Sequence, residues 1–260
     1  MYACGLSKIY TFGPTFRAEV SHTQRHASEF WMIEPEVAFA DLGDIMDLAE
    51  QFLKYTLKWV LEHNHDDLEF LNAQIEKGLI SRLQQITSTP FKRITYTEAI
   101  DILQKAIKEK GVKFEHEVSW GIDLAKEHET YITDKVFNMP TMVSNYPKDI
   151  KSFYMRLNPD GKTVSAVDVL VPRVGEIIGG SQREERLSLL EKRIEELKLN
   201  KSAYEGYLAL RRFGTVVHSG FGLGFERLVM YATGIENIRG KSIFLRLPIP
   251  IIIKSIFLLN

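Results

Sequence analysis

Strand-like segments lie toward both ends of this 260-residue chain and enclose a helical middle. The first two segments, 9–16 and 30–39, are separated by a polar loop. The later ones, in chain order, are 141–146, 153–157, 163–171 and 174–182. Strands grouped in this way, rather than alternating with helices one by one, are typical of α+β proteins. We therefore predict an α+β fold with an antiparallel β-sheet flanked by helices.

The predicted helices are marked by apolar spacing and by capping residues. The first covers 42–61, where apolar residues recur at intervals of three and four. The next begins at Thr95, which forms a capping-box pattern with Glu98, and ends near Gly111. Further helices are predicted at 123–135, 184–199 and 225–233. An Asn-Pro-Asp-Gly sequence at 158–161 predicts the turn of a hairpin between the strands on either side of it.

Charge and cysteine content exclude several functional classes. The chain has 33 Lys and Arg against 34 Asp and Glu, so its net charge of -1 gives no general attraction to nucleic acid or to a membrane surface. A single cysteine, Cys4, rules out an internal disulfide and favours a reducing compartment. The first twelve residues lack the pattern of a secretory signal. The apolar stretch 242–260 is interrupted by Arg246, Lys254 and two prolines, which argues against a membrane-spanning helix.

Charged residues first gather where the first strand ends. Arg17 and Glu19 are two positions apart, so on a strand they point to the same face. They can clamp an anion beside an amine or metal, or they can form a simple cross-strand ion pair. In the loop that follows, Arg25 and His26 can reach a polyphosphate and Phe30 can stack on a base, although such loops are commonly just solvated surface.

Two carboxylates lie on the next, otherwise apolar strand. Glu34 and Glu36 share a face there, and burying a carboxylate without a partner is costly. We expect each to face a ligand or an arginine.

The segment 168–183 combines acidic residues with paired glycines. Asp168 and Glu176 lie on predicted strands, and strand carboxylates that face one pocket suit a magnesium–nucleotide complex. Gly179 and Gly180 allow a close backbone approach, with Ser181 and Arg183 following them. The alternative is a β-bulge without a ligand. Nearer the C-terminus, alternating glycines precede a helix whose first turn carries Arg227, a position suited to a phosphate.

Four longer sequences, taken together, resemble one family. They are FGPTFRAE, RHASEFWMIEPEVAF, GEIIGGSQREERL and RRFGTVVHSGFGLGFERLVMYATGIENIR. They are similar to the catalytic domain of asparaginyl-tRNA synthetases, class II enzymes of the aspartyl and lysyl subgroup, and the resemblance covers residues 2 to 239. It implies a class II catalytic domain over 1–239, followed by an atypical apolar tail over 240–260. FRAE and GFGLGFER resemble the second and third class-defining motifs.

The resemblance also implies a reaction and a set of site residues. Asparagine attacks the α-phosphate of ATP to form an adenylate, and a ribose hydroxyl of tRNA(Asn) then accepts the acyl group. The residues implied as catalytic are Arg17 and Arg227. Those implied to bind ATP are Arg17, Glu19, Arg25, His26, Phe30, Asp168, Glu176 and Arg227. Asp168 and Glu176 are implied to bind Mg²⁺. Glu34, Ser181 and Arg183 are implied to bind asparagine.

The resemblance further implies a homodimer, with an anticodon-binding domain and a first motif before the region matched here. The sequence begins just before the second motif, so we expect self-association, weak ATP binding and little charging of tRNA by this polypeptide alone. A cytoplasmic enzyme is implied, with mitochondrion or plastid as the alternative. Two other functions remain open: a paralogue that makes asparagine or an adenylate without tRNA, and a non-catalytic binding or regulatory module.

Overall fold

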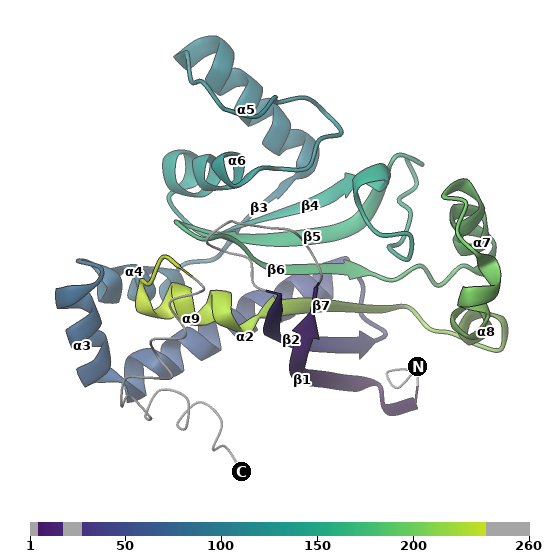
Figure 1. Ribbon diagram of the computed structural model, residues 1–260, viewed down its shortest axis with the longest axis horizontal. Coiled ribbons are helices and arrows are strands. Elements are labelled where there is room, and N and C mark those ends of the chain that lie inside the picture. Colours follow the sequence, from purple (N-terminus) through teal and green to yellow (C-terminus); the bar gives the residue numbers. More distant parts are fainter. Residues whose placement is uncertain (1–4, 18–27, 238–260) are drawn as a thin grey trace. The chain divides into compact units, whose positions relative to one another are not determined.

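The chain forms two compact units in the computed structural model, which describes residues 5–17 and 28–237 (Figure 1). We call them the larger and the smaller unit. The larger unit comprises Met1–Thr11, Glu34–Ala49 and Lys92–Gly222, and the smaller unit Phe12–Ile33, Glu50–Phe91 and Leu223–Asn260. Each is described by its own contacts.

A seven-stranded sheet has most of its residues in the larger unit. Its strands follow the order β1-β2-β7-β6-β5-β4-β3. Their bounds are β1 Lys8–Phe16, β2 Glu29–Ala38, β3 Lys92–Thr95, β4 Thr141–Pro147, β5 Thr163–Val171, β6 Gly175–Gln182 and β7 His218–Gly224. The pairs β4–β5 and β5–β6 are antiparallel, whereas β3 pairs with β4 in parallel. The predicted α+β class is confirmed, with a parallel edge pair that the sequence pattern did not indicate.

Helix α5 (Tyr96–Lys110) covers one face of this sheet together with α6 (Lys126–Thr130), as Figure 1 shows. The predicted capping box is present, because Thr95 Oγ1 accepts a hydrogen bond from the Glu98 N–H and the Glu98 carboxylate accepts one from the Thr95 N–H. Gly111 ends the helix in the left-handed conformation, with φ of 64°. The core beneath α5 is formed by Ile94, Tyr96, Ala99, Ile100, Leu103, Leu124, Ile132, Val143, Tyr146, Val164, Ala166 and Leu170.

The helix predicted at 123–135 begins three residues later than expected. Ala125 is its N-cap, and the ring Nδ1 of His128 accepts the Ala125 N–H at 3.2 Å, which fixes the start of α6 at Lys126. After Thr130 the chain widens into a π-helical segment, Tyr131–Phe137, and Asn138 ends it in the left-handed region. Burial lowers the pKa of His128, whose side chain is fully buried.

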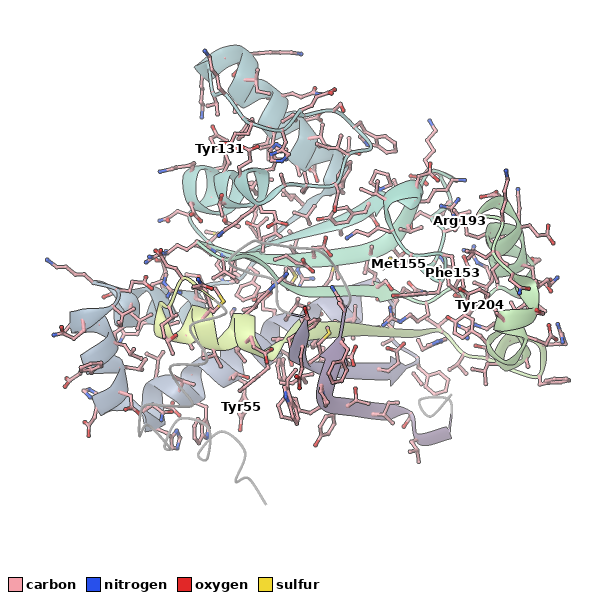
Figure 2. All side chains as sticks on the ribbon, in the orientation of Figure 1. Tyr55, Tyr131, Phe153, Met155, Arg193 and Tyr204 are labelled. Carbon is pink, nitrogen blue, oxygen red and sulfur yellow. The ribbon has the colours of Figure 1, made fainter. Side chains whose placement is uncertain are left out.

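Helices α7 (Leu187–Glu196) and α8 (Glu205–Arg212) pack together at one end of the larger unit (Figure 1). Leu190, Ile194 and Leu208 form a separate small core there, against which Phe153 and Tyr204 pack (Figure 2). The prediction that the helix at 184–199 starts at 184 is wrong. Residues 184–186 are held in an extended connection, in which the Glu184 N–H donates to the Tyr154 carbonyl.

Residues 153–157 do not form the predicted strand. Only two isolated bridges appear there, Met155 with Arg183 and Leu157 with Val164. The turn at 158–161 is present, with Gly161 at φ of 67°, so the hairpin exists in a shorter form than predicted.

The smaller unit contains α3 (His65–Gln74), α4 (Leu79–Ser88), α9 (Phe225–Thr233) and the second half of α2 (Leu42–His63). An ion pair ties α4 to its neighbours: Arg82 donates two hydrogen bonds to the nearly buried Glu76 at 2.8 and 2.9 Å. Arg82 also donates to the Tyr231 carbonyl at 2.9 Å and lies 4.4 Å from the centre of the Tyr231 ring. Within the described ranges no helix is both long and apolar enough to cross a bilayer.

Candidate functional site

Arg183 and Glu36 form a two-pronged ion pair in the larger unit. Arg183 Nε donates to Glu36 Oε1 at 2.8 Å, and Nη2 donates to Oε2 at 3.0 Å. The third nitrogen, Nη1, donates to Ser181 Oγ at 2.6 Å. The expectation that Glu36 faces an arginine is confirmed. This fork geometry fixes the plane of the guanidinium group, which suits recognition of a planar polar group.

Gly220 on β7 makes room for this pair. A Cβ atom at Gly220 would overlap the Glu36 carboxylate and would lie 2.6 Å from the Pro35 carbonyl oxygen. On β6, a Cβ at Gly180 would lie 2.8 Å from the Phe221 Cβ. Both glycines therefore permit close approach between strands. At Gly220 the space is filled by the Glu36 carboxylate of the chain itself.

The neighbours of Arg183 keep it charged. Burial alone lowers the pKa of Arg183, but the hydrogen bonds and the charge of Glu36 raise it, and the net pKa is above its usual value. The Tyr154 ring lies 5.4 Å from the Arg183 guanidinium carbon. The Arg183 backbone N–H donates to the carbonyl of His218, a buried histidine whose pKa is lowered by burial. The site thus contains a permanently charged guanidinium whose charge is balanced by the carboxylate of Glu36.

The contacts of Glu34 differ from those of this ion pair. It is exposed, and its carboxylate accepts a hydrogen bond from Thr11 Oγ1 at 3.3 Å. The guanidinium of Arg183 is bonded to Glu36 instead. The pairing of Glu34 with Arg183 around a substrate amide stays a prediction.

A second cluster surrounds Asp168 on β5. Lys151 Nζ lies 2.7 Å from Asp168 Oδ2 and 4.0 Å from the centre of the Tyr146 ring. The buried Tyr146 also forms a side-chain hydrogen bond with Asp168. Burial raises the pKa of Asp168 and the charge of Glu176 adds to that rise, while Lys151 opposes it, and the net pKa is above its usual value.

The two predicted magnesium carboxylates converge over Gly179. A Cβ atom built there would lie 2.9 Å from Glu176 Oε1 and 3.5 Å from Asp168 Oδ1, so only glycine leaves the space between them open. Hard carboxylate oxygens around such a cradle fit Mg²⁺, which takes one or two carboxylates and completes its shell with phosphates and water. No group of three or more His, Cys, Asp or Glu able to hold a metal occurs among the described residues.

The two clusters lie on the same face of the sheet. Asp168 pairs with Gly179 and Ala166 pairs with Ser181 across β5 and β6. Directly paired residues of antiparallel strands share a face, and alternate residues along a strand do too. Asp168, Ser181 and Arg183 therefore point to one side.

In the smaller unit, Arg17 and Phe30 come together. The Arg17 guanidinium lies 5.1 Å from the centre of the Phe30 ring, and the Arg17 N–H donates to the Ser28 carbonyl at 2.9 Å. The side chain of Arg17 is exposed. The guanidinium therefore lies over the Phe30 ring at a distance typical of a cation–π contact, and an exposed guanidinium suits a phosphate.

Arg227 lies in the first turn of α9, as predicted. Its aliphatic stem folds back over Gly224, where an added Cβ atom would lie 3.8 Å from Arg227 Cδ. The neighbouring Glu226 is buried and accepts the Trp31 N–H at 2.9 and 3.0 Å, which anchors the helix start to β2. Arg17, Phe30 and Arg227 therefore belong to one unit. Glu19, Arg25 and His26 lie outside the described residues.

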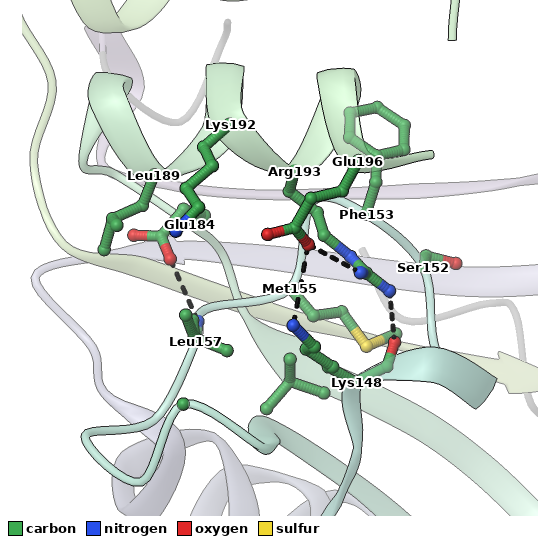
Figure 3. Close-up of a pocket in the computed structure, with 12 residues that line it drawn as sticks. Lys148, Ser152, Phe153, Met155, Leu157, Glu184, Leu189, Lys192, Arg193 and Glu196 are labelled. Carbon is green, nitrogen blue, oxygen red and sulfur yellow. Dashed lines mark hydrogen bonds and ion pairs between the residues drawn. The ribbon is translucent and has the colours of Figure 1, made fainter. Parts of the chain in front are cut away.

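A pocket of about 150 Å³ lies between α7 and residues 148–157 (Figure 3). Phe153 and Met155 are among the residues that line it, together with an ion-pair cluster in which Arg193 donates to the Lys148 carbonyl and to Glu196. Lys148 Nζ lies 3.5 Å from the Glu196 carboxylate. These bonds attach the segment before the hairpin to α7, so the rim charges serve to hold the two together.

Lys151, Tyr146 and the pairing of Glu36 with Arg183 were not assigned to the site from the sequence. Tyr146 lies in a predicted strand, where an aromatic residue is expected to be part of the core. Lys151 lies in a segment without regular spacing of apolar residues. A long-range partner of this kind leaves no local signal.

Comparison with known proteins identifies the family. The family model described as tRNA synthetases class II (D, K and N) matches residues 1–247. The chain belongs to the class II tRNA synthetases. Among curated members of this family, asparagine–tRNA ligase, cytoplasmic 1, of Arabidopsis thaliana is 59% identical over 247 residues, which are 95% of this chain and 43% of the relative. Asparagine–tRNA ligase of Clostridium acetobutylicum is 61% identical over 238 residues, 92% of this chain and 50% of that protein.

Solved structures of synthetases agree with the fold. Asparaginyl-tRNA synthetase from Pyrococcus horikoshii complexed with asparaginyl-adenylate has a TM-score of 0.82 and 43% identity, and the match covers 92% of this chain and 52% of that one. The Entamoeba histolytica asparaginyl-tRNA synthetase in complex with asparaginyl-adenylate has a TM-score of 0.79 and 30% identity, over 91% and 52% of the two chains. The chain thus spans about half the length of the relatives it matches.

Proposed function

We propose that this chain activates L-asparagine with ATP as part of an asparagine–tRNA ligase. One observation carries the proposal: about 60% identity to asparagine–tRNA ligases across more than nine-tenths of the chain. The relatives solved with asparaginyl-adenylate support it. The asparagine carboxylate oxygen attacks the α-phosphorus, the bond to pyrophosphate breaks, and a ribose hydroxyl of tRNA(Asn) then takes the acyl group while AMP leaves.

The proposed roles follow the chemistry of each residue. Arg17 bridges the asparagine carboxylate and the α-phosphate, and neutralises charge that builds up in the transition state. Phe30 and Arg227 stack on the two faces of adenine, and Arg227 also meets the γ-phosphate. Glu19, Arg25 and His26 are assigned to the adenine amino group and the outer phosphates.

Asparagine recognition is assigned to Arg183, Ser181 and Glu34. Arg183 donates to the amide oxygen of the substrate, and its plane is set by Glu36. A carboxylate at Glu34 accepts from the amide nitrogen and repels the carboxylate of aspartate, which gives selection against the nearest competitor. Mg²⁺ supplies charge neutralisation to the phosphates when it is bound, and Asp168 and Glu176 would hold it.

The homodimer, the tRNA(Asn) acceptor end as a partner, and a cytoplasmic place of action belong to the proposal as well. The Arabidopsis relative, whose name places it in the cytoplasm, supports the last of these over mitochondrion or plastid. The division into a catalytic domain at 1–239 and a tail at 240–260 stays a prediction.

Binding of two unreactive adenylate analogues tests the proposal without requiring turnover. The 260-residue chain should bind the asparaginyl sulfamoyl-adenosine more tightly than the aspartyl one, by about tenfold or more. Arg17→Met should abolish binding of both, and Glu34→Gln should narrow the difference between them. Equal affinity for the two analogues would contradict asparagine specificity. Ammonia-dependent formation of asparagine from aspartate would instead identify the paralogue, and binding of neither analogue would favour a non-catalytic module.

A further inference from the structure

Asp168 is held from one side by a largely buried cation. Lys151 Nζ contacts the Oδ2 oxygen at 2.7 Å, and the two side chains are only 16% and 14% exposed. An ammonium group and a carboxylate at this distance form a charge-assisted hydrogen bond, which restricts rotation of the carboxylate about its Cβ–Cγ bond. Lys151 therefore fixes where the second oxygen of Asp168 points.

The second oxygen faces Glu176. Asp168 Oδ1 and Glu176 Oε1 lie within 3.5 Å and 2.9 Å of the position that a Cβ at Gly179 would occupy. The two oxygens of Asp168 thus have different surroundings, Oδ2 toward an ammonium and Oδ1 toward a second carboxylate. Two carboxylates that approach each other repel, and a cation on the far side of one of them offsets that repulsion before any metal arrives.

Lys151 is itself placed by Tyr146. Its ammonium lies over the Tyr146 ring at 4.0 Å, and the Tyr146 hydroxyl is hydrogen-bonded to the same Asp168. Tyr146 follows a register shift in β4, at which Asn145 adopts φ of 60°. Asparagine adopts the left-handed region more readily than most non-glycine residues. Asn158 Nδ2 donates to Asn145 Oδ1 at 3.1 Å and stabilises the bulge, which turns Tyr146 under the lysine.

We propose that Lys151, seated on Tyr146, is a positioning residue that aims Asp168 Oδ1 at a divalent metal shared with Glu176. The inference rests on the proposed function only in assigning a metal to this cradle. The ammonium does not occupy the metal position, because it contacts Oδ2 and the cradle over Gly179 is formed with Oδ1. It acts as the outer partner that orients a metal-binding carboxylate, and loss of such partners commonly weakens metal binding.

Titration with Mn²⁺ alone, followed by the electron paramagnetic resonance of the free ion, tests this on the 260-residue chain. Neither ATP nor asparagine is present, so the outcome is independent of the proposed reaction. Lys151→Met should weaken Mn²⁺ binding by about tenfold or more. Lys151→Arg should bind close to the wild-type affinity, because a guanidinium can still donate to Oδ2. Lys148→Met is the matched control: it lies in the same segment, pairs with Glu196, and should leave Mn²⁺ binding unchanged.

The opposite results would overturn the proposal. Equal or tighter Mn²⁺ binding by Lys151→Met would show that the lysine competes with the metal or is indifferent to it. A wild-type chain that takes up no Mn²⁺ would remove the metal from this cradle. If Lys151→Met does not fold by circular dichroism, Lys151→Gln is the second variant, because it keeps a polar side chain and removes the charge that holds Asp168 Oδ2: weakened Mn²⁺ binding supports the proposal and unchanged binding refutes it. Analogue binding that fails while these Mn²⁺ results hold would refute the proposed function alone.

Discussion

Replacing Glu36 by glutamine should destabilise the larger unit by an amount that its geometry sets. The change keeps the volume of the side chain but turns one carboxylate oxygen into an N–H donor, which then faces a donor of Arg183. Hydrogen bonds to charged groups contribute about 1.5–3 kcal/mol each, and breaking a fully buried pair from one side costs about 3–5 kcal/mol. Because Arg183 and Glu36 are 17% and 25% exposed, water offsets part of this, and we expect a loss of about 2 kcal/mol.

Urea unfolding, followed by circular dichroism, measures the loss. Glu34→Gln is the matched control, since Glu34 is on the same strand but exposed, and it should change the free energy of unfolding by about 0.5 kcal/mol or less. Combining Glu36→Gln with Arg183→Met should cost less than the sum of the two single changes, because each already removes the same pair. If Glu36→Gln and Glu34→Gln are equally mild, or the double variant is additive, the ion pair does not hold the strands together.

Three further predictions concern stability. Thr95→Ala should lower the free energy of unfolding by about 1 kcal/mol through loss of the α5 cap, and an unchanged urea midpoint would contradict this. Glu76→Gln should cost about 3 kcal/mol because it leaves the guanidinium of Arg82 without its partner, whereas an exposed pair would cost almost nothing in the same measurement. Burial lowers the pKa of His128 below its usual 6.5, so the unfolded chain binds more protons below that pH, and stability should fall as pH is lowered through it. His128→Gln should reduce this loss of stability at low pH. The part that stays in the variant is expected from His218, whose pKa is also lowered by burial. An identical dependence of stability on pH in the variant would show that His128 is not responsible.

Local signals predicted local structure well. The capping residues of α5 act within one turn of the chain, so Thr95 and Gly111 could be assigned from the sequence. The valine-rich strand β5 was also predicted closely. Segment 153–157 has the composition of a strand, but its pairing is divided between two neighbours: Met155 bridges Arg183 and Leu157 bridges Val164, and no continuous ladder forms. Tertiary contacts overrode its local preference.

The candidate site was predicted in its residue types and less well in its contacts. The face shared by Asp168 and Arg183 follows from strand alternation, which a sequence displays. The choice of Glu36 over Glu34 as the partner of Arg183 depends on which of two carboxylates lies over Gly220, and the two positions are alike in the sequence pattern. The parallel pairing of β3 and the role of Lys151 likewise depend on segments that are distant along the chain.

The absence of a side chain at Gly220 is what allows Glu36 to lie beside Arg183 and balance its charge. Any side chain larger than hydrogen would expel the Glu36 carboxylate from its place over β7, and Arg183 would then turn toward other acceptors. A position with no functional group of its own therefore governs the electrostatics of its neighbours. In a saturation mutagenesis screen we expect replacement of this glycine to be tolerated as poorly as replacement of Arg183. A screen for the proposed asparagine activation would therefore identify Gly220 as if it were a catalytic residue.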